Sequence, residues 1–250
     1  MYYKFFRKII GILGYKLVDK NLIKNNRLLS NYTSINTEKI IENLFLDNHI
    51  KTIIQIGSND GQRFDILGKL IKKYFPKVIF VEPIESSFKQ LKEYHNNQGN
   101  LFFENSAISV NNEINSLYKV KESKLAFYDN HISGITSFNK KHLVKHGVKK
   151  NHIIEERVKS LSMKDLINKY SIENFDFLLI DTEGYDAKIV FDFLSNSKIR
   201  PIIFFEYIHS ENKSLKNTMD ILKSNDYFLY KINENLACFP KNIIEKIKFF

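Results

Sequence analysis

The sequence predicts an α/β fold with a mainly parallel sheet that is closed by a C-terminal antiparallel pair of strands. From about residue 50, short apolar runs alternate with amphipathic stretches, which is typical of β-α-β units. Polar residues follow the apolar runs, and the last two runs lie close enough together to form a hairpin. With 250 residues, 43% of them hydrophobic, the chain can bury a full core as one domain.

The elements of this fold are assigned in chain order. Apolar runs predict strands at residues 52–56, 78–81, 101–103, 177–180 and 202–205. Amphipathic spacing predicts helices at residues 64–74, 86–95, 163–170, 187–194 and 215–223. Ser162 and Asp165 have the spacing of a capping box at the start of one of these helices. Residues 227–232 and 235–239 are expected to pair as a hairpin around Asn233 and Glu234.

The N-terminal segment is considered separately. Residues 1–45 are expected to form a helical appendage packed on the core, and residues 46–250 the main domain with an insertion at about 110–160. The first twenty residues read MYYKFFRKIIGILGYKLVDK, and their longest uncharged run, Ile9 to Tyr15, is far shorter than the ~20 residues of a spanning helix. We expect a docking helix here, with peripheral contact with a membrane as the alternative.

Charge and cysteine content narrow the choice of partners and compartment. The formal net charge is +10, but the lysines are spread along the chain, which indicates a solvated surface or an anionic substrate or membrane. No nucleic-acid partner is expected, because no zinc-finger spacing or base-stacking motif is present. The single cysteine, Cys238, cannot form an intrachain disulfide, so a reducing cytoplasm is the expected location, with the inner face of the membrane as a variant.

A glycine-bounded loop follows the first predicted strand. Its residues Gly57, Ser58, Asn59, Asp60 and Gly61 join a strand to a helix, an arrangement that brings backbone N–H groups close to a ligand. The spacing G-x-x-x-G differs from the G-x-G-x-x-G of dinucleotide folds, and a glycine turn also occurs there for steric reasons alone.

An acid ends the next predicted strand, at the position where nucleoside-binding sheets hold the ribose. Glu82 lies 21 positions after Gly61, and a carboxylate can accept hydrogen bonds from both hydroxyls of a ribose. Ser106 and Ala107 follow the third strand, where small residues leave room for an adenine ring. Together with the glycine loop, these residues predict a nucleoside site.

The last two parallel strands are followed by titratable side chains. Asp181 directly follows a buried run, and Glu206 and His209 follow the adjacent strand. Because ligands bind at the carboxyl edge of such sheets, the three are expected to surround one reacting group.

Seven segments across about residues 50–210 are considered together: IIQIGSNDGQRFD, VEPIESSFKQL, FFENSAIS, GITSF, RVKSLSMKDLI, FDFLLIDTEGYDAKIV and PIIFFEYIH. In this order they resemble the FkbM family of S-adenosylmethionine-dependent methyltransferases. The resemblance implies a class I methyltransferase (Rossmann-like) fold, with a seven-stranded, mainly parallel sheet in the order 3-2-1-4-5-7-6. It also implies S-adenosylmethionine as cofactor and O-methylation of sugars in surface polysaccharides or of secondary metabolites.

The resemblance assigns a role to each cofactor residue. It implies that Gly57 and Gly61 shape the loop, that Ser58, Asn59 and Asp60 lie near the methionine portion, that Glu82 holds the ribose, and that Ser106 and Ala107 border the adenine. From its place at the end of the fourth strand, Asp181 is also expected to contact the cofactor. Ser58 stands where many members have alanine, and Gln55 where an aspartate is common, so a charged contact at Gln55 is not expected.

For the reaction, Asp181 and His209 are the expected bases, with Glu206 orienting one of them or the acceptor. The alternative is that Asp181, Glu183 and Glu206 hold Mg²⁺. The insertion, including His131, Ser133 and residues 134–137, is expected to form much of a pocket for a small-molecule or glycan-precursor acceptor. Methylation of a phosphate-type or other small-molecule acceptor, and a non-catalytic nucleoside-binding or scaffold protein, stay open as alternatives.

Overall fold

The structure is a computed structural model that describes residues 37–47, 49–62, 65–95, 99–112, 116–129, 132, 134–232 and 234–244. The helix and the membrane contact predicted for residues 1–20 lie outside this set, as do His131 and Ser133. Helix α3 (Thr37–Leu46) is described, and its Ile41, Leu44 and Phe45 are buried in the core. Within the described residues, no helix combines the length and the apolar character needed to cross a membrane.

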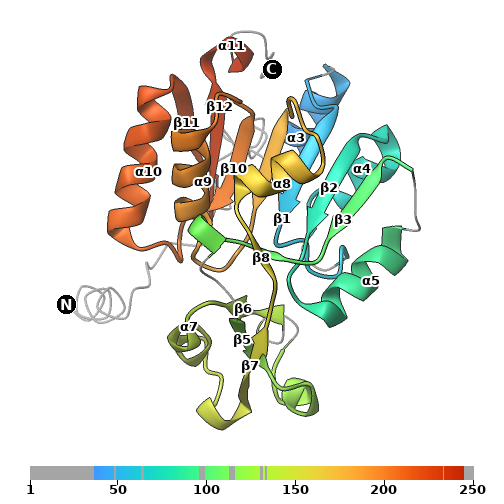
Figure 1. The fold of residues 1–250 in the computed structure, drawn as a ribbon, viewed down its shortest axis with the longest axis vertical. Helices are drawn as coiled ribbons and strands as arrows, with labels where there is room; N and C mark the ends of the chain where they lie inside the picture. Colours follow the sequence, from blue (N-terminus) through green and yellow to red (C-terminus); the bar gives the residue numbers. More distant parts are fainter. Residues whose placement is uncertain are drawn as a thin grey trace, which may run out of the picture. The chain divides into compact units, whose positions relative to one another are not determined.

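A seven-stranded sheet forms the centre of the fold, in the order β11-β12-β10-β9-β1-β2-β3 (Figure 1). Its strands are β1 (Thr52–Ile56), β2 (Lys77–Val81), β3 (Leu101–Glu104), β9 (Phe177–Ile180), β10 (Ile202–Glu206), β11 (Tyr227–Ile232) and β12 (Asn235–Pro240). The first five run parallel, whereas β12 is antiparallel to both β10 and β11. Numbered within this sheet and read from β3, the order is 3-2-1-4-5-7-6, so the predicted class I methyltransferase fold is confirmed.

Helices cover both faces of this sheet because its strands are apolar on both sides. Besides α3, the helices are α4 (Gly68–Tyr74), α5 (Glu85–His95), α8 (Met163–Lys169), α9 (Asp186–Asn196), α10 (Asn212–Ser224) and α11 (Lys241–Ile244). Ile54 and Ile203 pack with α8, α9 and α10 on one face, while Ile53 and Ile202 pack with α3, α4 and α5 on the other. The predicted capping box of Ser162 and Asp165 is present at α8.

One predicted helix is shorter in the structure than expected. Helix α4 begins at Gly68, whereas the sequence pattern predicts a start at Phe64, which lies outside the described residues. The Asp65 carboxylate accepts a hydrogen bond from the Leu67 N–H at 2.9 Å. This local turn competes with helix formation and delays the start of the helix.

The insertion folds as a small unit with its own core. The chain leaves and returns through the parallel pair β4 (Ala107–Ile108) and β8 (Ser160–Leu161). Between them lie a sheet in the order β6-β5-β7 and helix α7, which Figure 1 shows beyond β8 and apart from the main sheet. The remaining elements are η1 (Val110–Asn112), β5 (Ser116–Val120), η2 (Glu122–Phe127), β6 (Thr136–Ser137), α7 (Lys140–Lys145), η3 (Lys150–His152) and β7 (Ile153–Arg157). Val120, Leu143 and Ile153 are buried at its centre.

Candidate active site

Strand register brings the predicted site residues to one edge of the sheet. Ile56 pairs with Val81 on one side and with Ile180 on the other. The residues that follow these three, Gly57, Glu82 and Asp181, therefore leave the sheet side by side. In the same way the register places Glu206 beside Asp181, because Phe205 pairs with Ile180.

Gly57 occupies a position that other residues cannot take. Its φ is +80°, a left-handed conformation that costs L-residues energy, and its N–H donates to the Val81 carbonyl at 2.9 Å. A Cβ atom added there would overlap the Asp181 carbonyl oxygen. The missing side chain thus allows the first loop to pass directly against the end of β9.

Glu82 fastens this loop to the second strand. Its Oε2 accepts from the Asn59 N–H at 2.8 Å and its Oε1 from the Ile84 N–H at 2.9 Å. Burial raises the pKa of this carboxyl to about 7, while the two backbone hydrogen bonds act in the opposite direction. Each carboxylate oxygen has a second lone pair, so Glu82 can still accept the two hydroxyls of a ribose. Its role in ribose binding stays a prediction.

The other loop residues divide into two groups. Ser58 and Asn59 line a cavity at the edge of the sheet, the larger of the two described below, and the Ser58 hydroxyl donates to the Gln55 carbonyl at 3.0 Å. Asp60 and Gly61 are not among the residues that line it. Asp60 accepts from the Gln62 N–H at 3.0 Å, and a Cβ on Gly61 would lie 2.7 Å from a Leu91 methyl group. The structure thus places this pair behind the loop, where it supports the turn.

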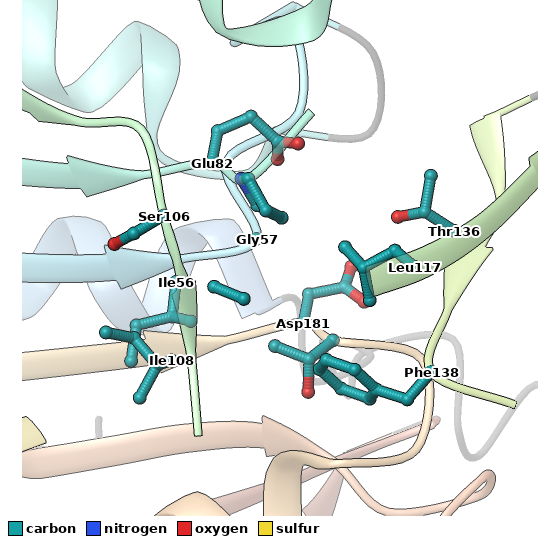
Figure 2. A pocket seen from close by; sticks show the side chains of 12 residues that line it. Ile56, Gly57, Glu82, Ser106, Ile108, Leu117, Thr136, Phe138 and Asp181 are labelled. Atoms are coloured by element: carbon teal, nitrogen blue, oxygen red, sulfur yellow. The ribbon is translucent and has the colours of Figure 1, made fainter. Parts of the chain in front are cut away.

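Two adjoining cavities open at this edge. The larger holds about 380 Å³ and is bordered by Gly57, Asp181, Glu206 and Thr136 of the insertion. The smaller, shown in Figure 2, shares Gly57, Glu82, Thr136 and Asp181 with it and is also lined by Ser106 and Ala107. The Ser106 Oγ is fully buried and has no hydrogen-bond partner among the described residues, so a polar group of a ligand could satisfy it.

The floor of the larger cavity is rich in carboxyl groups with raised pKa values. Asp181 is exposed at the edge of the sheet, and desolvation by the protein around it together with the nearby charges of Asp186 and Glu183 raises its pKa to about 8. Burial and the charges of Asp181 and Glu183 raise that of Glu206 to about 9. A ligand that carries positive charge, such as a sulfonium or an ammonium group, would stabilise the ionised acids. These acids therefore suit the positively charged sulfonium and ammonium groups of S-adenosylmethionine.

Asp186 shapes the loop that follows Asp181. Its buried carboxylate accepts from the Thr182 hydroxyl at 2.8 Å and from the N–H groups of Thr182 and Gly184 at 3.2 and 3.1 Å. These bonds hold Glu183 at a φ of +55° and Gly184 at +110°. Because a Cβ on Gly184 would lie 2.9 Å from the His209 carbonyl oxygen, this loop packs tightly against the end of β10.

His209 lies near the acids but belongs to a second cluster. Its Nε2 is 3.8 Å from both Glu206 Oε1 and Glu183 Oε2. Burial and the charges of His142 and His146 lower its pKa, while Glu183 opposes the shift. The residues that line the larger cavity include Asp181 and Glu206 but not His209. The structure thus brings Asp181 and Glu206 together and sets His209 beside the insertion.

The described residues hold two groups of potential metal ligands whose atoms lie within 4.8 Å of one another. One group is His142, His146 and His209, and the other is Glu183, Glu206 and His209. The alternative Mg²⁺ set of Asp181, Glu183 and Glu206 is not among them, because Asp181 belongs to neither group. His142 and His146 were missed as site residues, although their H-x-x-x-H spacing is visible in the sequence.

We expect Glu206→Gln to stabilise the ligand-free protein at alkaline pH. The folded pKa of about 9 lies above the ordinary value of 4.5, so the folded state keeps a proton that the unfolded state loses. This contribution to stability is complete below pH ~4.5 and disappears as the pH rises through about 9. Since glutamine mimics the protonated acid, the free energy of unfolding of the variant should exceed that of wild type by roughly 1–3 kcal/mol near pH 9.

Thermal unfolding at a series of pH values measures this effect. A gain of at least about 2 °C in Tm is expected at alkaline pH, and none below pH ~4.5. Glu93→Gln is the matched control, because Glu93 is exposed within α5 and its replacement should change Tm little. A Tm difference for Glu206→Gln that does not change with pH would contradict the raised pKa.

The chain was compared with known proteins and solved structures. No curated protein matches the chain significantly. Among solved structures, the methyltransferase FkbM from Methylobacillus flagellatus is 13% identical with a TM-score of 0.45, and the match covers 76% of this chain and 44% of that chain. This chain thus spans less than half the length of that protein.

Two further solved structures are similar over comparable stretches. A TehB-like SAM-dependent methyltransferase from Corynebacterium glutamicum is 11% identical with a TM-score of 0.36, covering 88% of this chain and 95% of that chain. Fibrillarin from Aeropyrum pernix, in complex with S-adenosyl-L-methionine, is 8% identical with a TM-score of 0.39, covering 76% and 66%.

The sequence itself matches a family over most of its length. Residues 55–229 match the methyltransferase FkbM domain, and this range runs from the end of strand β1 to the first strand of the C-terminal hairpin. It contains Gly57, Glu82, Asp181 and Glu206. The chain therefore belongs to the FkbM family of S-adenosylmethionine-dependent methyltransferases.

Proposed function

We propose that this protein transfers a methyl group from S-adenosylmethionine to a hydroxyl group of a sugar or nucleotide-linked precursor in surface polysaccharide synthesis. The observation that carries the proposal is the position of Asp181. Its carboxyl group borders both cavities, lies beside the glycine loop and has a pKa of about 8. A carboxylate of raised basicity at this place suits the removal of a proton from an alcohol.

The cofactor is proposed to lie along the edge formed by β1, β2 and β3. When bound, it supplies an electrophilic methyl group on a sulfonium centre. The loop from Gly57 to Asn59 offers close backbone approach, Glu82 offers two acceptor oxygens, and Ser106 offers an unused hydroxyl in the smaller cavity. Asp60 and Gly61 act in this proposal only by supporting the loop.

Asp181 is proposed as the base that accepts the acceptor's proton. Glu206 lines the same cavity, and burial and the charge of ionised Asp181 raise its pKa, so we propose that Glu206 keeps its proton while Asp181 is ionised. Such a neutral acid can donate a hydrogen bond to the acceptor, while Asp181 takes the proton at a carboxylate oxygen. His209 lies outside the lining of this cavity, so we assign proton abstraction to Asp181.

The acceptor is proposed to enter from the side of the insertion. Gly134 and Thr136 line the larger cavity, and Leu117 and Phe138 line the smaller. Exposed Lys140 and Lys141 at the start of α7 would favour an acceptor that carries phosphate. The single cysteine, Cys238, is buried in the core, which agrees with the reducing cytoplasm that we propose as the location.

Methyl transfer to a panel of acceptors tests this proposal. The purified chain is incubated with S-adenosylmethionine and with nucleotide-linked sugars, free sugars, amines and phosphate monoesters, and the methylated atom is located by NMR. An ether methyl group on a sugar is the expected product. Methylation of nitrogen or of a phosphate oxygen would contradict the proposed acceptor. Cofactor binding without transfer to any class would favour the non-catalytic alternative.

Glu82→Gln is expected to weaken S-adenosylmethionine binding by about 10- to 100-fold. The amide replaces one acceptor oxygen with a donor, which would face the N–H of Asn59 or Ile84 and leave one ribose hydroxyl without its partner. Loss of one hydrogen bond to a charged group costs roughly 1.5–3 kcal/mol. Calorimetry with S-adenosylmethionine measures the change. Glu85→Gln, three residues away on the exposed surface of α5, should bind like wild type.

A further inference from the structure

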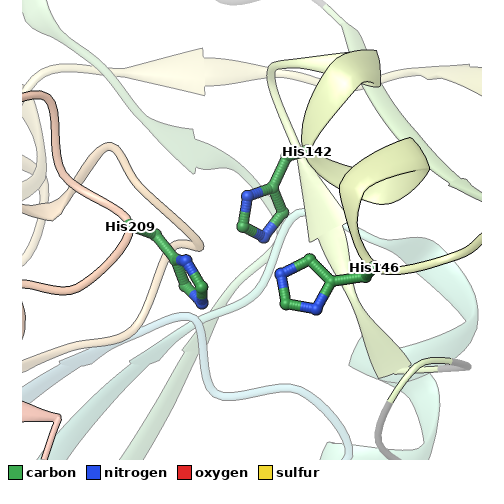
Figure 3. Close-up of side chains that lie close together, drawn as sticks. All are labelled: His142, His146 and His209. Atoms are coloured by element: carbon green, nitrogen blue, oxygen red, sulfur yellow. The ribbon is translucent and has the colours of Figure 1, made fainter. Parts of the chain in front are cut away.

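Three histidines from distant parts of the chain gather beside the active-site loops. His142 and His146 come from α7 and its C-terminal cap in the insertion, and His209 follows β10 of the main sheet (Figure 3). The ring centroids of His142 lie 4.5 Å from those of both His146 and His209, and the His146 and His209 centroids are 5.2 Å apart. One ring nitrogen from each residue lies within 4.8 Å of the other two.

The local fold presents His142 and His146 on one helical face. Asn139 caps α7 by accepting a hydrogen bond from the Lys141 N–H at 3.0 Å, and the His146 N–H donates to the His142 carbonyl at 3.2 Å. This i to i+4 hydrogen bond places the two side chains one turn apart on the same side. Two histidines at this spacing on a helix are also the arrangement by which several zinc proteins present a pair of ligands.

A carboxylate completes the surroundings of the cluster. Glu183 Oε2 lies 3.0 Å from His142 Nε2 and 3.8 Å from His209 Nε2. The side chains of His142, Glu183 and His209 are only 11%, 22% and 20% exposed. Glu183 is in turn held by the Ser137 hydroxyl, which donates to its carbonyl oxygen at 3.2 Å. Three imidazoles and one carboxylate therefore lie close together and are partly shielded from solvent.

We propose that His142, His146 and His209 bind a divalent transition-metal ion, with Zn²⁺ the best match, and that Glu183 supplies the fourth ligand. Imidazole nitrogen is a preferred ligand for zinc, whereas Mg²⁺ and Ca²⁺ prefer oxygen ligands. Nitrogens around a tetrahedral zinc ion lie about 3.3 Å apart, so modest rotation of the rings would close the shell. Glu206, whose Oε1 is 3.8 Å from His209 Nε2, lies outside this shell as its neighbour.

This site would join three segments that are far apart in the sequence. His142 and His146 belong to the insertion, Glu183 to the loop after β9 and His209 to the loop after β10. The ion would thus hold the insertion on the main domain beside Asp181, which lies two residues before Glu183. Glu183 also lines the larger cavity, so the ion would adjoin the proposed site of methyl transfer, and its occupancy can be measured without any methyl acceptor.

Metal binding by the full chain tests the proposal. The protein is purified without a polyhistidine tag, stripped with EDTA and titrated with Zn²⁺ by calorimetry and with Co²⁺ by absorption spectroscopy. We expect one ion per chain, Co²⁺ bands of a four-coordinate site with nitrogen ligands, and a higher Tm with Zn²⁺. Replacing His142, His146 or His209 with alanine should weaken binding by more than the roughly 10- to 100-fold typical of losing an outer-shell partner.

Matched variants separate loss of a ligand from loss of the fold. His152→Ala removes a histidine from the same insertion, where its Nδ1 contacts the Tyr128 hydroxyl at 2.8 Å, and it should bind Zn²⁺ like wild type. His142→Gln and His209→Gln retain polar side chains if the alanine variants fail to fold, as judged by circular dichroism, and should also lose the ion. Absence of stoichiometric Zn²⁺ binding by the stripped wild type, or unchanged affinity in folded cluster variants, would overturn the proposal.

Discussion

Gly57→Ala is expected to abolish S-adenosylmethionine binding and to destabilise the fold. The new methyl group would overlap the Asp181 carbonyl oxygen at the end of β9, and alanine is disfavoured at a φ of +80°. The loop must move away from β9, which would also break the Gly57 N–H bond to Val81 and shift Asn59 from Glu82. We expect the free energy of unfolding to fall by about 2–4 kcal/mol and cofactor affinity to fall by more than about 100-fold.

Calorimetry and thermal unfolding measure the two effects, and two glycines provide controls. Gly147 has a φ of +86° but no atom within 4 Å of an added Cβ, so Gly147→Ala isolates the backbone strain. Gly99 has no positive φ and no atom within 4 Å of an added Cβ, so Gly99→Ala should behave like wild type. If Gly57→Ala were folded and bound the cofactor as tightly as Gly147→Ala, the first loop would not form the cofactor site.

Asp181→Asn is expected to lower turnover by about 10²- to 10⁴-fold and to lower cofactor affinity by much less, because Asp181 is one of several acids that border the cavity. Asparagine retains the size of the side chain but cannot accept a proton from a hydroxyl group. In wild type, kcat/KM should rise with pH through the ionisation of Asp181, whose pKa is about 8, because the base acts in its ionised form. A bound cation would lower the pKa of Asp181 and would therefore shift the rise of kcat/KM to lower pH.

Initial rates across pH, with the acceptor that the panel identifies, measure the effect of Asp181→Asn. The variant should lack the rise of kcat/KM with pH that wild type shows. Asp220→Asn changes an exposed aspartate on α10 in the same chemical way and should leave rate and pH profile unchanged. If Asp181→Asn turned over as fast as wild type, Asp181 would not be the base that accepts the acceptor's proton. This conclusion would hold even if the methylated product were as proposed.

The main sheet was predictable because its signals are local and strong. Phe177 to Ile180 and Ile202 to Phe205 are apolar runs buried on both faces, and each predicted strand agrees with the structure to within one residue at either end. The side-by-side placement of Gly57, Glu82 and Asp181 followed from the same pattern, since parallel strands in register end at one edge.

The parts that the sequence does not predict depend on contacts between distant residues. His209 was expected to face a reacting group, which stays a prediction; the structure places it 3.8 Å from Glu206 and also against His142 and His146, 67 and 63 positions earlier in the chain. That pairing depends on how the insertion folds, and strands as short as Thr136–Ser137 have no readable periodicity. Aspartate is a residue type common in ligand sites, but the Asp60 carboxylate accepts a hydrogen bond from the Gln62 N–H. The residue type alone does not predict this partner.

The hydrogen bonds of Glu82 have a consequence for the thermodynamics and kinetics of cofactor binding. Because Glu82 holds the N–H groups of Asn59 and Ile84, the first loop is ordered before any ligand arrives. A preorganised loop loses little conformational entropy on binding, so more of the contact energy is expressed as affinity. Association should then occur in a single step without a slow rearrangement, at a rate set by diffusion and by access to the cavity.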